Sequence, residues 1–137
     1  MKTNTTWLVW ARRGAALAGA MDFGTGAALV AVPVLALRLM GLEVPGAEAL
    51  VFLRWVGAFV GAVGASYLVA AWHGSEERLR AVFTLTMIFR LAAGGYSAVA
   101  ILSGWLGWGW GWVSVPVTDL TLVAVQWWVL RKGEWSR

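Results

Sequence analysis

The apolar run from Ala49 to Trp72 constrains the fold of this chain more than any other stretch. About 20 apolar residues cross a bilayer as a helix, and this run is longer than that and holds a single charge, Arg54. At helical spacing, Gly57, Gly61 and Gly64 share a stripe with Arg54. Lipid gives helices no hydrophobic reason to associate, so a stripe of small residues indicates close packing against another helix, in this chain or in a partner. We therefore expect a membrane helix whose arginine points into protein.

Three further apolar runs predict an all-α integral membrane protein. The expected fold is a bundle of four antiparallel spans, at about residues 15–37, 49–72, 81–103 and 113–130, in one domain covering residues 1–137. Met1–Arg13 is expected to be an interfacial lead-in, and Pro33 to bend the first span. Composition agrees, since 60 % of the residues are hydrophobic and only 13 % are charged. Such a chain cannot cover itself with polar side chains.

Several function classes are excluded or disfavoured by what the sequence lacks. It has no cysteine, which excludes disulfides, thiolate metal sites and cysteine nucleophiles. It also has no phosphate loop, nucleophile elbow, metal cluster or dinucleotide fingerprint. We therefore predict no enzyme activity, and at most a non-catalytic subunit of an enzyme complex. The net charge is +4, and most of the basic residues lie just outside the apolar runs. This placement favours membrane lipids over nucleic acid as the partner.

The basic residues also predict the orientation in the membrane. With both termini cytoplasmic, the far side holds only Arg38, while the near side holds Lys2, Arg12, Arg13, Arg78, Arg80, Arg131, Lys132 and Arg137. This asymmetry follows the positive-inside rule and suggests a multi-pass protein of the bacterial inner membrane. Tryptophans are expected to anchor both interfaces: Trp105, Trp108, Trp110 and Trp112 on the outer side, and Trp127 and Trp128 on the inner side.

Each expected span carries one ionisable residue: Asp22, Arg54, Arg90 and Asp119. At about 1.5 Å per residue, Asp22 and Arg90 lie roughly 10–13 Å from the same boundary and Asp119 lies near the middle. Arg54 is nearer the outer boundary, and either reaches Asp119 or extends to the headgroups. Four charges that sum to zero favour a structural network holding the helices together. The alternative is a proton or ion path, or a polar pocket for a carboxylate or a quinone headgroup.

Two other features have a structural and a functional interpretation. His73 is the only histidine, so it is either a solvated loop residue or a single axial ligand for haem or chlorophyll. The segment from Gly104 to Trp112 is either a lipid anchor or a stacking platform for a pigment, a quinone or a partner. The sequence requires no cofactor, and lipid, quinone or pigment is expected only at the periphery. Gly94, one turn after Arg90, continues a second stripe for helix packing.

The segments FLRWVGAFVGAVGASYL and TMIFRLAAG resemble the small four-helix inner-membrane proteins of the DoxX-like kind. The resemblance covers the second and third spans. It implies a four-helix membrane fold, and some members of that group are linked to quinone-reactive oxidoreductase complexes.

These observations lead to two expected functions and leave a third open, an intramembrane enzyme that acts on lipid or quinone. The first is an accessory or scaffolding subunit, bound to other transmembrane subunits of a larger membrane complex. An energy-converting complex, for respiratory or photosynthetic electron transport, is the expected host. The second is a small oligomeric transporter or channel that uses the intramembrane aspartates and arginines.

Overall fold

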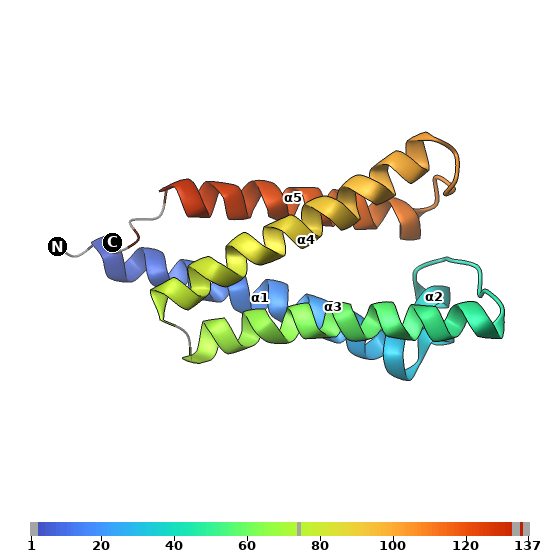
Figure 1. Ribbon diagram of the computed structural model, residues 1–137, viewed down its shortest axis with the longest axis horizontal. Helices are drawn as coiled ribbons and strands as arrows, with labels where there is room; N and C mark the ends of the chain where they lie inside the picture. The colour runs from blue at the N-terminus through green and yellow to red at the C-terminus, as the bar shows by residue number, and fades with distance from the viewer. Residues whose placement is uncertain (1–2, 74, 133–134, 136–137) are drawn as a thin grey trace.

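The computed structural model describes residues 3–73, 75–132 and 135, and all of its regular structure there is helical. The helices are α1 (Thr3–Ala31), α2 (Pro33–Leu39), α3 (Ala47–His73), α4 (Glu76–Leu102) and α5 (Trp110–Lys132) (Figure 1). Four of them are long and apolar enough to cross a membrane. The prediction of an all-α protein with four long apolar helices is therefore confirmed. Which side of the membrane each end faces stays a prediction.

The first helix differs from the expected pattern at both ends. Of the residues predicted as an interfacial lead-in, 1 and 2 lie outside the described part, and the rest form one helix with the first span, since α1 begins at Thr3. Their position at the membrane surface stays a prediction. No proline separates the two segments, and Gly14 alone does not end a helix. The break comes instead at Val32, whose φ is −134° and ψ is 54°. Pro33 follows as the first residue of α2, because proline lacks the N–H that would continue α1.

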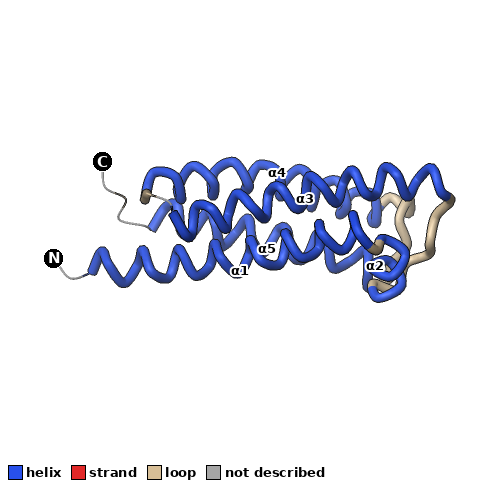
Figure 2. The backbone as a smooth tube through the Cα atoms, turned by 90° about the horizontal axis from the view of Figure 1, so that it is seen from below, coloured by secondary structure: helices blue, strands red, loops and turns tan. Residues whose placement is uncertain are grey.

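The long helices pack as two pairs. The first pair, α1 and α3, lies along one side of the molecule and the second pair, α4 and α5, along the other (Figure 1). All four long helices run along the same long axis (Figure 2). Contacts between the two pairs are fewer than contacts within them. Any group that joins the pairs therefore matters for the arrangement of the whole molecule.

Glycines set the distance between α1 and α3. A Cβ on Gly26 would lie 2.5 Å from the Gly57 carbonyl oxygen, and a Cβ on Gly57 would lie 2.7 Å from Leu29 Cβ. Gly64 approaches Gly19 in the same way, with 2.7 Å between its virtual Cβ and the Gly19 carbonyl oxygen. The glycine stripe of α3 is thus occupied by α1 of the same chain.

The two ends of the molecule differ in packing. At the turn end, where α3 connects to α4, buried residues from three helices form an apolar core: Ala11, Ala15, Tyr67, Ala70, Leu79 and Phe83. Ser75 caps α4 there, its Oγ accepting from Arg78 N at 3.3 Å. At the loop end lie α2, the loop before α3 and the loop before α5 (Figure 1). Under the predicted orientation, the loop end is the outer side.

Candidate functional site

The two helix pairs meet at one arginine in the middle of α4. Arg90 is only 5 % exposed. Its Nη1 donates to Asp119 Oδ1 of α5 at 2.6 Å, and its Nη2 donates to Asp22 Oδ2 of α1. The planar guanidinium has five N–H donors in a fixed fork, so it can serve two carboxylates at once. Arg90, Asp22 and Asp119 are called the ion-pair cluster below.

Local sequence makes room for this arrangement. Gly94 follows Arg90 by one helical turn, and a Cβ there would lie 2.9 Å from Asp119 Cβ. The absent side chain lets α5 come close enough for Asp119 to meet the guanidinium. On the other side, the guanidinium carbon of Arg90 lies 5.7 Å from the centre of the Tyr67 ring, within the range of a cation–π contact.

Three uncharged polar residues extend the cluster toward the turn end. Arg90 Nε donates to the Tyr67 hydroxyl at 3.5 Å, and Gln126 Nε2 donates to the same oxygen. Thr86 Oγ1 lies 2.6 Å from that hydroxyl and 2.6 Å from the Val82 carbonyl oxygen. A carbonyl only accepts, so Thr86 donates to Val82 and the proton between the two hydroxyls comes from Tyr67. The polar network therefore joins all four long helices.

These three residues were not predicted as members of the cluster, although their spacing was a usable signal. Thr86 precedes Arg90 by one turn and Gln126 follows Asp119 by two turns, so each lies on the face of its helix that carries the charge. Tyr67 is fully buried on α3, the helix that contributes no charge to the cluster. Its position is set by the packing of α3 on α1.

Arg54 does not belong to the cluster. It was expected to point into protein, and either to reach Asp119 or to extend to the headgroups; in the described part of the chain it forms no ion pair with either aspartate. It is exposed, and it lines a groove at the loop end together with Arg38. The physical reason is the break before Pro33. The helix that would cover Arg54 ends at Ala31, and α2 takes a different course (Figure 1).

The cluster consequently has two carboxylates and one guanidinium, a formal charge of −1. Each aspartate uses one oxygen for Arg90. The second oxygens, Asp22 Oδ1 and Asp119 Oδ2, make no hydrogen bond within residues 3–73, 75–132 and 135, and neither is among the fully buried polar atoms. The cluster is thus short of positive charge and has two acceptor oxygens to spare.

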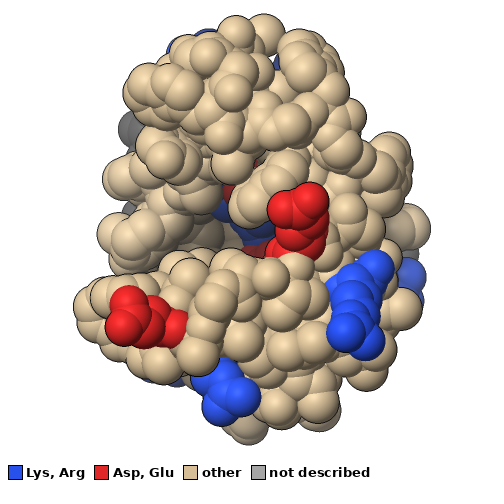
Figure 3. All heavy atoms as spheres, turned by 90° about the vertical axis from the view of Figure 1, so that its right-hand side faces the viewer, with Lys and Arg blue, Asp and Glu red and all other residues tan. Residues whose placement is uncertain are grey.

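The surface at the loop end is hollowed. Figure 3 looks onto this end, and both acidic and basic side chains are visible at the floor of the hollow. The side chains of Asp22 and Asp119 are 11 % and 16 % exposed, and the side chain of Arg90 is 6 % exposed. The carboxylates are therefore the accessible part of the cluster, and the guanidinium is the enclosed part.

The other predicted residues lie away from the cluster. His73 is exposed as the last residue of α3. The expected interface anchors lie at both ends of α5 and in the loop before it, all at least partly exposed: Trp105, Trp108, Trp110, Trp112, Trp127 and Trp128. Gly61 faces Gly26 at 3.8 Å from its virtual Cβ to the Gly26 Cα. In the described part of the chain, no three His, Cys, Asp or Glu residues are grouped to hold a metal ion.

The chain was compared with models of known families, with curated proteins and with solved structures, and none of them matches. The likeness of its second and third spans to DoxX-like proteins therefore stays a resemblance. The class of protein is defined by the structure itself: an all-helical chain with four apolar helices compatible with a membrane.

Proposed function

We propose that this protein is a small membrane transport protein, with a cation site at the ion-pair cluster. The observation that supports it is the sharing of one guanidinium by two carboxylates, Asp22 and Asp119, among helices that suit a membrane interior. A neutral ion pair is enough to hold helices together. The second carboxylate pairs with the same guanidinium and brings no second cation, so its negative charge stays unbalanced and calls for a functional reason.

The chemistry of the cluster favours a proton or a small monovalent cation. An unbalanced negative charge in a low-dielectric environment attracts positive charge strongly. The two spare carboxylate oxygens are hard ligands of the type that small cations prefer. Arg90 keeps both carboxylates in place by holding their other oxygens. It also makes the cluster less negative, which favours exchange of the cation over permanent binding.

The hollow supplies the route in this proposal. It opens at the loop end, which faces outward under the orientation predicted from the basic residues. Beyond the cluster, Tyr67, Thr86 and Gln126 continue the polar network toward the turn end. A cation would enter from the outside and reach Asp119 and Asp22. Hydroxyl and amide groups lie on the inner side of that position.

The test is ion flux in liposomes containing the purified protein. Vesicles with an internal pH-sensitive dye report proton movement, and separate gradients of Na⁺ and K⁺ identify the ion. We expect flux in the natural chain and its loss in Asp119→Asn, which removes the net charge and keeps the shape. Glu48→Gln is the matched control, because Glu48 is an exposed carboxylate at the loop end. Absence of flux in the natural chain, or full flux in Asp119→Asn, would reject the proposal.

A second candidate is the accessory subunit of a larger bacterial inner-membrane complex, with an energy-converting complex as host. The observation in its favour is a cluster of exposed tryptophans at the loop end. Trp105, Trp108 and Trp110 are 72 %, 73 % and 81 % exposed. Aromatic side chains of this kind dominate contacts with partner proteins as well as with headgroups. Native mass spectrometry of the protein extracted from its own membranes tests this candidate, which requires a partner subunit at fixed stoichiometry.

A further inference from the structure

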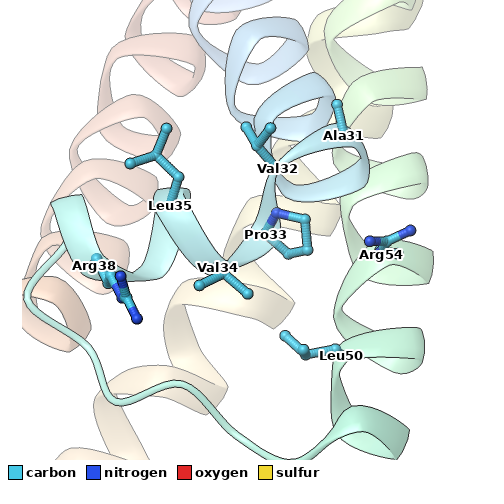
Figure 4. Close-up of a pocket in the computed structure, with 8 residues that line it drawn as sticks. All are labelled: Ala31, Val32, Pro33, Val34, Leu35, Arg38, Leu50 and Arg54. Atoms are coloured by element: carbon cyan, nitrogen blue, oxygen red, sulfur yellow. The ribbon is translucent and has the colours of Figure 1, made fainter.

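A groove at the loop end is lined by two arginines outside the ion-pair cluster, Arg38 and Arg54. It has a volume of about 340 Å³. Arg38 of α2 lies on one side of it and Arg54 of α3 on the other, while Pro33, Val34 and Leu50 form the apolar surface between them (Figure 4). We call it the Arg38–Arg54 groove. It exists because the chain breaks at Val32 and α2 leaves the face of α3.

The two guanidinium groups of this groove are not neutralised by the protein. Within residues 3–73, 75–132 and 135, the ion pairs found are those of Arg90, so neither Arg38 nor Arg54 is paired with a carboxylate there. Both acidic residues near this end, Glu43 and Glu48, are exposed and unpaired with them. Two positive charges flanking an apolar groove have a net affinity for an anion.

The predicted spans put the groove near the outer headgroup layer. Arg54 lies roughly 10 Å from the start of α3 at about 1.5 Å per residue, and Arg38 is next to the last residue of α2. Under the predicted orientation, this is the outer boundary of the membrane, the side on which arginine is disfavoured. Arginine also binds phosphate through a planar fork of donors, which suits it to an anionic headgroup.

We propose that the Arg38–Arg54 groove binds one anionic phospholipid of the outer leaflet. The headgroup phosphate lies between the two guanidinium groups, and an acyl chain lies along Pro33, Val34 and Leu50. The apolar surface argues for a lipid rather than a free anion, since a dissolved phosphate gains nothing from it. This inference is independent of the proposed transport function, because it uses none of the residues of the ion-pair cluster.

The experiment measures lipid retention by native mass spectrometry. The protein is reconstituted in nanodiscs of phosphatidylglycerol and phosphatidylcholine, released into detergent and weighed with its bound lipids. We expect one phosphatidylglycerol per chain, and roughly tenfold weaker retention in Arg38→Gln/Arg54→Gln, the loss expected when charge-assisted phosphate contacts are removed. Arg78→Gln/Arg80→Gln is the matched control, since these exposed arginines lie at the turn end. The control is expected to retain the lipid.

Two further measurements complete the test. Circular dichroism and size-exclusion chromatography establish that the double variant folds. The single variants Arg38→Gln and Arg54→Gln each keep one guanidinium, so each is expected to lose only part of the lipid retention. Inorganic phosphate added at millimolar concentration should leave the bound lipid in place. Equal retention by the double variant and the control would overturn the proposal, and so would displacement of the lipid by inorganic phosphate.

Discussion

Gly94 and Asp119 are in contact across the α4–α5 interface, with 2.9 Å between the Asp119 Cβ and the Cβ that Gly94 lacks. The missing side chain lets α5 come close enough for Arg90, one turn before Gly94, to reach Asp119. The pair between Arg90 and Asp22 does not involve this contact. The relationship gives a direct prediction.

Replacing Gly94 with alanine should destabilise the protein, although alanine is the better helix former. The added methyl group forces Asp119 away from Arg90, and overpacking of this kind costs about 1–3 kcal/mol. The neighbouring Gly95 has open space around its missing Cβ, so Gly95→Ala should be neutral or stabilising by up to about 1 kcal/mol. Thermal unfolding in detergent, followed by circular dichroism, measures both. Equal behaviour of the two variants would contradict the packing described for α4 and α5.

The same comparison is available in α1. Gly26→Ala places a methyl group 2.5 Å from the Gly57 carbonyl oxygen, where a rigid backbone cannot yield. We expect a loss of roughly 3 kcal/mol, at the upper end of overpacking costs, with separation of α1 from α3. Gly24 has nothing within 4 Å of its missing Cβ, and Gly24→Ala should leave the midpoint of unfolding unchanged or raise it. A midpoint of unfolding for Gly26→Ala that is not below that of Gly24→Ala would contradict the close packing of α1 on α3.

Substitution of Arg90 should lower the folded yield much more than substitution of Arg54. Arg90→Met leaves Asp22 and Asp119 without a cation, and breaking a buried pair in this way costs about 3–5 kcal/mol. We expect a low folded yield after extraction. Arg54→Met keeps the ion-pair cluster and should give a normal yield. Fluorescence-detected size-exclusion chromatography of tagged variants reports both yields, and a monodisperse Arg90→Met protein would show that the cluster is dispensable for folding.

Tyr67→Phe tests the polar extension of the cluster. The tyrosine oxygen accepts from Arg90 and Gln126. Its removal leaves Arg90 Nε without this acceptor, while Gln126 Nε2 keeps a second acceptor, Thr86 Oγ1, at 3.0 Å. A lost buried hydrogen-bond partner costs about 1–3 kcal/mol. A loss of unfolding free energy in this range, with little change in the helical signal, is the expected result. Since the ring itself is retained, a larger collapse of structure would point to a different role for the hydroxyl.

The orientation can be measured without preparing a special background, since the chain has no cysteine. Gly107→Cys places a thiol in the loop before α5, and Glu77→Cys places one in the first turn of α4; both positions are exposed. A membrane-impermeant maleimide applied to intact spheroplasts should label only Gly107→Cys. Labelling of Glu77→Cys alone would reverse the predicted orientation, and with it the direction assigned to the hollow.

The sequence was sufficient for the helices and for part of the site. Long apolar runs determine membrane-length helices almost regardless of context. Asp22, Arg90 and Asp119 were recognisable as a group because their signs are opposite and their depths similar. Thr86 and Gln126 were recognisable in principle from their spacing to those charges, and Tyr67 was not, because nothing in α3 alone shows where its face meets α4.

The position of Arg54 could not be derived from its own helix. It lies at the edge of the glycine stripe, so a small difference in how far α1 extends decides whether it is covered or exposed. The bend at Pro33 was expected, but the packing of the segment after α2 against the start of α5 was not. Gly111, at the start of α5, lies against Leu42, with 2.7 Å between the virtual Cβ and Leu42 Cγ. That contact is between segments far apart in the sequence.

The wide sequence separation of Asp22 and Arg90 has a consequence during synthesis. The two residues are 68 positions apart, and translation at about 5–20 residues per second needs roughly 3–14 s to cover that distance. For those seconds the aspartate has left the ribosome and its arginine has not. An unpaired aspartate among lipids is costly, so we expect the nascent α1 to stay beside water or within the insertion machinery until α4 emerges.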